Sequence, residues 1–275
     1  MGLLYRGIEI KTPEQIDAMR RAGLVVGSTL ELLREHVRAG ITTAELDGIA
    51  EDSIRTAGAT PSFLGYHGFP ASICASVNDE VVHGIPGDRV LADGDVISID
   101  CGAIVDGWHG DSAITVSVGA VPAEVTALME VTEQAMWRGI AAAHLGGRVT
   151  DISHAVERHV QSQGRFGIVE DYTGHGIGSE MHQPPNVPNY GRPGKGPRLV
   201  PGLALAVEPM ITLGSKETDL LEDEWTVVTA DGSWAAHFEH TFTITTEGTW
   251  VLTALDGGEQ QLSDLGVRFG GRRAV

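Results

Sequence analysis

Two segments near the start of the chain carry apolar residues at helical spacing. The first begins with Thr12-Pro13-Glu14-Gln15, a capping box with proline at the first helical position, and its apolar face runs from Ile16 to Leu30. The second begins at Thr42, with Glu45 completing another capping box, and Gly58 is suited to end it. We therefore expect two amphipathic helices, followed by strands at 72–77, 95–105 and 111–118.

From Pro122 onward the same order of patterns starts again. Helical patterns cover about 123–145 and 150–163, and strand patterns follow near 168–172, 203–213, 225–229 and 237–246. The two halves, about 13–118 and 122–253, share this order rather than obvious sequence identity. We expect an α+β fold in which one mixed central sheet is backed by helices, with residues 1–253 forming a single domain.

Two segments show neither the helical nor the strand pattern of apolar residues. Residues 183–201 are rich in proline and glycine, which predicts a surface loop over one edge of the sheet. Residues 254–275 end with Gly270-Gly271-Arg272-Arg273, which predicts a loosely ordered C-terminal tail.

Net charge limits the classes of binding partner, and cysteine content indicates the cellular compartment. The net charge of −18 argues against nucleic acid or an anionic membrane as the main partner. No apolar stretch approaches the ~20 residues of a membrane span, and the first residues do not resemble a secretory signal. Cys74 and Cys101 lie in apolar runs, so we expect two buried, reduced thiols in a cytoplasmic protein.

Four carboxylates interrupt or end segments that are otherwise suited to a buried sheet. Asp100 ends the run 96–99, Glu208 follows the run 203–207, and Glu239 lies inside 237–242. A buried, unpaired carboxylate costs at least several kcal/mol, and these segments contain no lysine or arginine. Two divalent cations would balance the charge of these three residues and Asp111, with His175 as a neutral fifth ligand. The pattern indicates a two-metal hydrolase.

Taken singly, each of these residues has a simpler explanation. Asp100 and Asp111 flank the hairpin signal Asp106-Gly107, so a strand end and a turn residue account for them equally well. Glu208 precedes a proline, which is typical of a strand break or an edge. Glu239 is compatible with a solvated strand face.

The histidines are also ambiguous when taken one at a time. His175 lies in the glycine-rich string 173–178, but Met181-His182-Gln183-Pro184-Pro185 cannot open a helix, which argues against a dinucleotide site. His182 follows His175 by seven residues, and His83 follows an apolar run. A lone histidine in such a place is more often structural than catalytic.

In their order along the chain and their residues, these motifs resemble those of the type I methionine aminopeptidases of the short bacterial form. The resemblance covers about residues 8–253 and rests on the motifs Gly65-Tyr66-His67-Gly68-Phe69-Pro70, Ser76-Val77-Asn78, His83-Gly84-Ile85-Pro86, Ile99-Asp100-Cys101-Gly102, Trp108-His109-Gly110-Asp111, Gly174-His175-Gly176-Ile177-Gly178, Glu208-Pro209 and Phe238-Glu239-His240-Thr241. It implies a pita-bread fold with pseudo-two-fold related halves. It also implies two divalent ions (Co, Mn, Fe, Mg or Zn) on Asp100, Asp111, His175, Glu208 and Glu239, with Asp111 and Glu239 bridging.

The resemblance further implies an activity and roles for residues around the metals. The activity is removal of the N-terminal methionine from nascent polypeptides whose second residue is small. Glu208 would move a proton, His182 would stabilise the developing oxyanion, and His83 would contact substrate. Tyr66, Phe69, Cys74 and Trp225 would form the methionine pocket. A cytoplasmic monomer with at most a transient ribosome contact, no stable nucleic acid and no membrane partner is expected.

Departures from the family pattern affect the pocket rather than the metal ligands. Phe63, Phe69 and Val82 stand where some relatives have other residues, which leaves inhibitor preference open. A monovalent cation site near Asn78 also stays open. Two other functions share this fold: a peptidase directed at Xaa-Pro bonds, and a non-catalytic binding protein that has lost its ligands.

Overall fold

The computed structural model of the chain describes residues 7–272. Its helices are α1 (Pro13–His36), α2 (Thr43–Thr56), α3 (Ala123–Ala142), α4 (Val149–Gln163), α5 (Glu259–Asp264) and the short 3-10 helix η2 (Tyr66–Gly68). Both predicted capping boxes are present: the Thr12 and Thr42 side chains accept from the amides of Gln15 and Glu45, whose side chains bond back to the cap amides. None of the helices within residues 7–272 has the length and apolar character needed to cross a bilayer.

The strands fall into one large sheet and two small ones. They are β1 (Thr60–Pro61), β2 (Ile73–Val77), β3 (Glu80–Val82), β4 (Val96–Val105), β5 (Trp108–Ser117), β6 (Gly167–Ile168), β7 (Gly174–Gly176), β8 (Gln183–Val187), β9 (Ala204–Val207), β10 (Met210–Thr212), β11 (Thr218–Leu220), β12 (Val227–Thr229), β13 (Ala235–His237), β14 (Glu239–Ile244) and β15 (Thr249–Val251). The nine-stranded sheet has the order β1-β4-β5-β14-β9-β7-β8, with β2 on β4 and β15 on β14.

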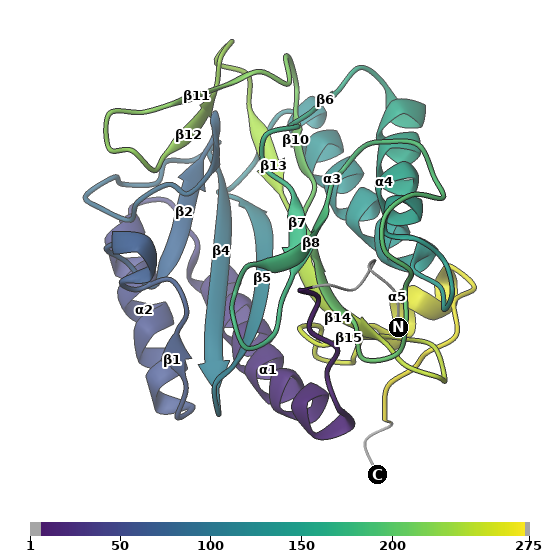
Figure 1. Ribbon diagram of the computed structural model, residues 1–275. Helices are drawn as coiled ribbons and strands as arrows, with labels where there is room; N and C mark the ends of the chain where they lie inside the picture. Colours follow the sequence, from purple (N-terminus) through teal and green to yellow (C-terminus); the bar gives the residue numbers. More distant parts are fainter. Residues whose placement is uncertain (1–6, 273–275) are drawn as a thin grey trace.

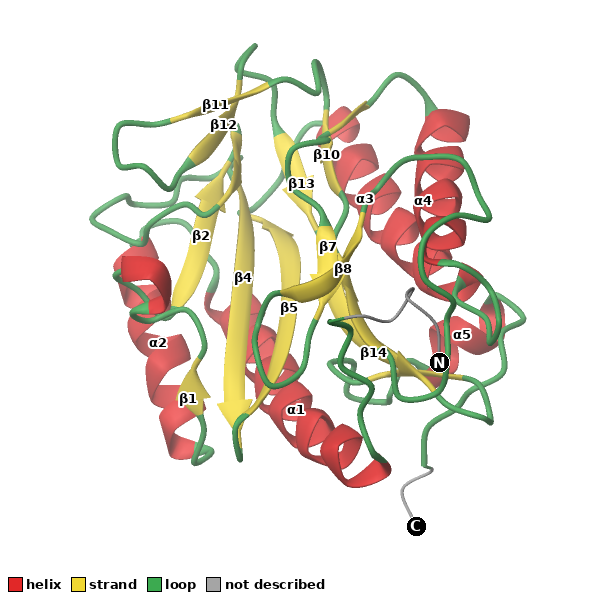
Figure 2. Ribbon diagram, in the orientation of Figure 1, coloured by secondary structure: helices red, strands yellow, loops and turns green. Residues whose placement is uncertain are grey.

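The helices lie against this sheet in two pairs (Figure 1). α1 and α2 accompany β1, β2, β4 and β5, whereas α3 and α4 accompany the strands of the second half (Figures 1 and 2). The repeated order of helices followed by strands thus appears as two similar halves that meet where β5 pairs with β14. The sheet was expected to be mixed, but all pairings between the named strands are antiparallel. Tight connections account for the pairings β4–β5, β7–β8 and β14–β15, because parallel neighbours need a long crossover.

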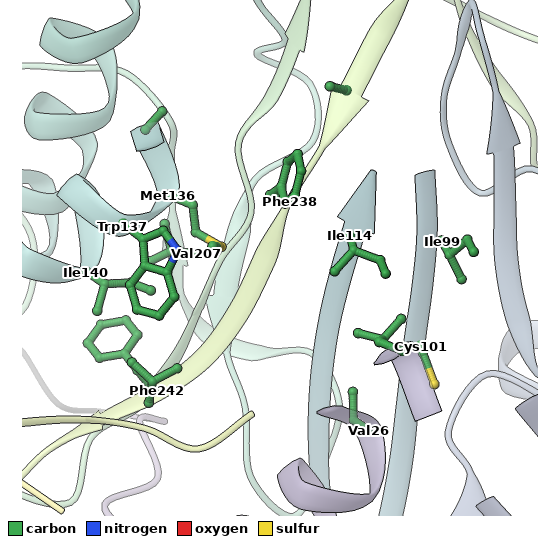
Figure 3. Close-up of a cluster of buried hydrophobic side chains, with 14 of the residues drawn as sticks. Val26, Ile99, Cys101, Ile114, Met136, Trp137, Ile140, Val207, Phe238 and Phe242 are labelled. Carbon is green, nitrogen blue, oxygen red and sulfur yellow. The ribbon is translucent and has the colours of Figure 1, made fainter. Parts of the chain in front are cut away.

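The core fills the space between helices and sheet in both halves (Figure 3). In the first half, Val26 of α1 lies near Ile99 and Ile114 of β4 and β5. In the second half, residues of α3 lie beside residues of β9 and β14: Met136, Trp137, Ile140, Val207 and Phe242. Both cysteines are buried and free, as expected.

The segment 183–201 was expected to be a loop, but its first part is the edge strand β8. β8 pairs with β7 in the registers Gly176↔Gln183 and Gly174↔Val187. The prolines in this segment do not prevent pairing, because an edge strand can direct positions without a backbone donor away from its neighbour. Sequence composition alone therefore missed the strand at this edge of the sheet.

The expected loose tail is another difference from the structure. Between 254 and 272 the chain forms α5, whose Leu262 is fully buried in the main core. The Gly270 amide donates to the Thr249 carbonyl, and the Arg20 guanidinium donates to the carbonyls of Leu252 and Ala254. These contacts hold the described part of the C-terminal segment onto β15 and α1. Residues 273–275 lie outside the described part of the chain.

Candidate metal centre and substrate pocket

The β4–β5 hairpin brings Asp100 and Asp111 to one face of the sheet. Asp106 and Gly107 have φ values of +52° and +81°, the left-handed pair that a two-residue hairpin turn requires. In the resulting register, Asp100 is opposite Ala113 and Gly102 is opposite Asp111, so the two aspartates are diagonal neighbours. The hairpin expected from Asp106-Gly107 therefore sets the first pair of carboxylates.

The second half delivers Glu239 and Glu208 beside this pair. Glu239 is opposite Ala113, and β14 pairs on its other edge with β9, after which Glu208 follows directly. The Thr241 hydroxyl donates to the Asp111 carbonyl and accepts from the Asp111 amide, which fixes the two strands relative to each other. Glu239 is only 2% exposed, so the solvated-face alternative is wrong.

His175 lies at the centre of β7, between two glycines that allow close backbone packing. A Cβ on Gly174 would lie 2.3 Å from the Ala206 carbonyl oxygen, and one on Gly176 would lie 2.3 Å from that of Pro184. The His175 Nδ1 is 3.0 Å from the Gly176 carbonyl oxygen, which makes Nδ1 the donor and leaves Nε2 with a free lone pair. That Nε2 is 3.5 Å from Glu208 Oε1.

All five predicted ligands meet in one place. Ligand atoms of Asp100, Asp111 and Glu239 lie within 4.8 Å of one another, and so do those of His175, Glu208 and Glu239. His182 also falls within such a group, together with Asp111 and His175. Glu239 is common to the first two groups, which gives the arrangement two adjoining ligand sets.

The carboxylates in this cluster are poorly compensated within the described residues. Asp100 Oδ1, Asp111 Oδ1 and Glu239 Oε1 are buried without a hydrogen-bond partner. Burial raises the pKa of Asp100 to about 7, and burial with neighbouring carboxylates raises the pKa of Asp111, Glu208 and Glu239 well above their usual range. Burial also lowers the pKa of His175 to about 3, which keeps its imidazole neutral and able to bind a cation.

These donors fit divalent metal ions. Orphaned carboxylate oxygens converge with one neutral imidazole, and oxygen-rich sets of this kind suit Mn, Fe, Co or Mg better than a metal that prefers thiolates. Cations would remove both the mutual repulsion and the unpaired acceptors. The alternative of unrelated strand ends and turn residues does not explain this convergence.

A cavity of about 130 Å³ opens directly onto the carboxylate cluster. Its remaining wall is mostly apolar and aromatic: Phe63, Tyr66, Phe69, Cys74, Val82, Met181 and Trp225, with His83 and His182. The Phe69 and Trp225 rings pack edge to face with centroids 5.0 Å apart. All the residues predicted to form a substrate pocket therefore line one cavity.

The two predicted catalytic histidines, His83 and His182, both line this cavity. His182 Nδ1 is 2.9 Å from the Tyr66 hydroxyl, and its ring lies 4.3 Å from that of His175. His83 packs edge-on against Tyr172 and Trp225. Burial lowers the pKa of His83 to about 4 and also lowers the pKa of His182, so both rings are neutral near pH 7.

Sequence reasoning missed His237 and Met181. The His237 Nε2 is buried without a partner and lies 3.9 Å from carboxylate oxygens of both Glu208 and Glu239. Its signal was present, because His237 lies two positions before Glu239 and strand alternation places such residues on one face. The strand is broken at Phe238, however, since β13 pairs with β10 and β14 lies in the large sheet. Met181 gave no signal beyond its place in the glycine-rich segment.

The fold and the carboxylate cluster are those of a metallopeptidase. Residues 17–246 match the sequence profile of metallopeptidase family M24, and the chain belongs to this family.

Within the family, its relatives include bacterial methionine aminopeptidases. The chain is 53% identical over 254 residues to methionine aminopeptidase 1 of Mycobacterium tuberculosis, covering 90% of this chain and 96% of that protein. It is 51% identical over 247 residues to the methionine aminopeptidase of Clostridium acetobutylicum, covering 90% and 98%.

Solved structures agree with this placement. The methionine aminopeptidase of Thermotoga maritima has a TM-score of 0.88 at 40% identity, covering 90% of this chain and 99% of that one. The prolidase of Pyrococcus furiosus has a TM-score of 0.71 at 22% identity and shares the fold alone. The predicted pita-bread architecture is confirmed.

Proposed function

We propose that the protein removes the N-terminal methionine from peptides and nascent polypeptides whose second residue is small. The observation that carries the proposal is the position of the apolar cavity, which ends directly at the carboxylate cluster. An unbranched thioether side chain fits an aromatic pocket of this kind, because sulfur packs favourably against ring edges. The identity to bacterial methionine aminopeptidases supports the same substrate.

We further propose that two divalent ions occupy the cluster, held by Asp100, Asp111, His175, Glu208 and Glu239, with Asp111 and Glu239 shared between them. Such ions supply Lewis acidity and a water nucleophile that is deprotonated near neutral pH. Two observations support these shared roles. Glu239 belongs to two of the ligand groups, and Asp111 lies beside it in one of them.

The protein groups then account for proton movement and orientation. Glu208 belongs to the carboxylate cluster and also lines the cavity, so its carboxylate lies where it can take up a proton and pass it to the leaving amine. The Tyr66 hydroxyl can donate to His182 Nδ1, which leaves the proton of the neutral ring on Nε2. His182 is thus prepared to donate to an oxygen that becomes negative during peptide cleavage. His83, held between two aromatic rings, would contact the substrate.

A release assay tests the substrate proposal. With added Mn or Co, the protein should liberate methionine from Met-Ala-Ser and leave Gly-Pro and Ala-Pro peptides intact. Met-Lys-Ser should be a poor substrate. Preferential cleavage of the proline peptides would instead favour an Xaa-Pro peptidase, and no cleavage of any peptide by metal-loaded protein would favour a binding protein.

We also propose that the two halves act as one catalytic domain, which includes the segment after residue 253 because Leu262 lies in its core, and that the protein works as a cytoplasmic monomer. Its strong negative charge argues against a stable complex with nucleic acid, so any contact with the ribosome would be transient. Sedimentation analysis of the protein alone would test the monomeric state. Sedimentation with ribosomes at physiological salt would test whether the contact is transient.

A further inference from the structure

His237 is a buried imidazole that faces the carboxylate cluster from outside the five ligands. Its side chain is 1% exposed, and its Nε2 has no hydrogen-bond partner among the described residues. That nitrogen lies 3.9 Å from Glu208 Oε2 and 3.9 Å from Glu239 Oε2. An orphaned polar nitrogen this well buried is rare, because each one costs roughly 1–3 kcal/mol when it stays unpaired.

The backbone of His237 is held firmly by the neighbouring strands. Its amide is within hydrogen-bond distance of the Thr115 and Ser98 hydroxyls at 2.9 and 3.3 Å, and its carbonyl accepts from Thr115 at 2.7 Å. Ser98 and Thr115 also bond to each other across β4 and β5. β13 is paired with β10, which begins two residues after Glu208. The backbone that carries the ring is therefore fixed relative to both halves of the site.

The two oxygens of Glu208 face different histidines. Oε1 lies toward His175 at 3.5 Å, and Oε2 lies toward His237 at 3.9 Å. One oxygen is thus turned toward the ligand set, while the other is turned toward a possible donor. A distance of 3.9 Å is too long for a hydrogen bond, so a closing movement of about 1 Å is needed.

We propose that His237 is a positioning residue of the metal centre, and that its Nε2–H holds Glu208 Oε2 so that Oε1 is presented to a metal ion. This inference rests on the proposed ligand set and deepens it. Glu208 is the partner rather than Glu239, because a bridging carboxylate uses both of its oxygens. Groups that orient metal ligands in this way typically change metal affinity by 10–100-fold when removed.

Metal affinity of the full-length protein, measured by calorimetric titration of the metal-free form with Mn, tests this role without reference to turnover. We expect His237→Ala to weaken Mn binding about 10–100-fold. His237→Gln, whose side-chain amide supplies an N–H donor, should recover most of that affinity. His240→Ala is the matched control, because His240 is a half-buried imidazole three residues further on that bonds to Ser112 and Thr253 instead.

The outcomes separate this inference from the proposed function. Wild-type affinity in His237→Ala would overturn the positioning role, and so would an equal loss in His240→Ala. A loss in His237→Gln as large as in His237→Ala would also overturn it, because the imidazole would then act as a ligand. Thermal unfolding of each metal-free variant identifies any that fail to fold, and in that case His237→Gln against wild type carries the test. Failure of methionine release by the metal-loaded wild type would contradict the proposed function alone.

Discussion

The ionisation of Asp100 links the pH to the stability of the metal-free protein. Its pKa is raised from 3.8 to about 7 by burial, so in the metal-free protein its proton is retained on folding. A carboxyl with a raised pKa contributes stability that is present below its unfolded pKa and is lost as the pH rises through the folded value. The relevant window is therefore about pH 4 to 7.

We expect Asp100→Asn to stabilise the metal-free protein at pH 8 but to have little effect at pH 4.5. The difference in the free energy of unfolding should grow through that window and then level off, reaching on the order of 1–4 kcal/mol. Urea unfolding of both proteins in chelator at several pH values would measure it. Comparing the two proteins cancels the common effect of the buried histidines, whose lowered pKa values destabilise the fold in acid. A constant difference across this range would contradict the assignment.

His175 and His182 lie close enough together to be mistaken for a pair of metal ligands. We expect His175→Ala to lower metal content, because its Nε2 points into the ligand set. His182→Ala should keep its metal and lose turnover by about 10²–10³, the usual effect of removing a donor to developing negative charge. The Michaelis constant should change much less.

Metal analysis and steady-state kinetics on the two variants decide between these roles. His182 also lies near Asp111, so loss of metal in His182→Ala would show that His182 is a ligand. Full turnover in that variant would remove it from the mechanism.

At the scale of elements, β7 is packed so tightly that it has no room for a side chain next to His175. We expect Gly174→Ala to destabilise the protein by about 1–3 kcal/mol, because its Cβ would lie 2.3 Å from the Ala206 carbonyl oxygen. Gly48→Ala is the matched control. Gly48 is exposed in α2 with no atom within 4 Å of an added Cβ, so the same change there should stabilise by about 0.5–1 kcal/mol. Thermal unfolding of both variants measures the contrast; equal effects would mean that β7 relaxes easily.

Local patterns predicted the elements well where the cause is local. The capping boxes at Thr12 and Thr42 and the turn at Asp106-Gly107 depend on residues a few positions apart, and all three are present. The continuous strand expected at 237–246 is instead divided at Phe238 between two sheets. That division depends on pairing with distant β10 and β9, which no local pattern records.

The site shows the same limit. Periodicity could mark Asp100, Glu208 and Glu239 as carboxylates in apolar segments, but it could not bring the two halves together. Asp111 and Glu239 lie close together because β5 pairs with β14. Only the resemblance to a family made the proximity of these two residues an expectation. The packed segment after 254 was missed because its contacts, such as Leu262 in the core, are also distant in sequence.

At the scale of the whole molecule, the uncompensated carboxylates predict that metal stabilises the fold. Metal at about 100 times its dissociation constant should add about 2.7 kcal/mol to the free energy of unfolding. For a chain of this size that corresponds to a rise of about 5–10 °C in Tm. Differential scanning calorimetry with chelator and with saturating Mn would measure the rise. Identical Tm values would mean that the cluster is satisfied without cations.

The division of the ligands between the halves has a consequence for protein engineering. Asp100 and Asp111 belong to the first half, whereas His175, Glu208 and Glu239 belong to the second, and Gly119 lies in the exposed link between them. A chain cut in this link would yield two fragments, neither of which holds a complete ligand set. Divalent metal should then act as a chemical inducer of reassembly, so that fragment complementation, followed by size-exclusion chromatography, becomes a readout of metal concentration.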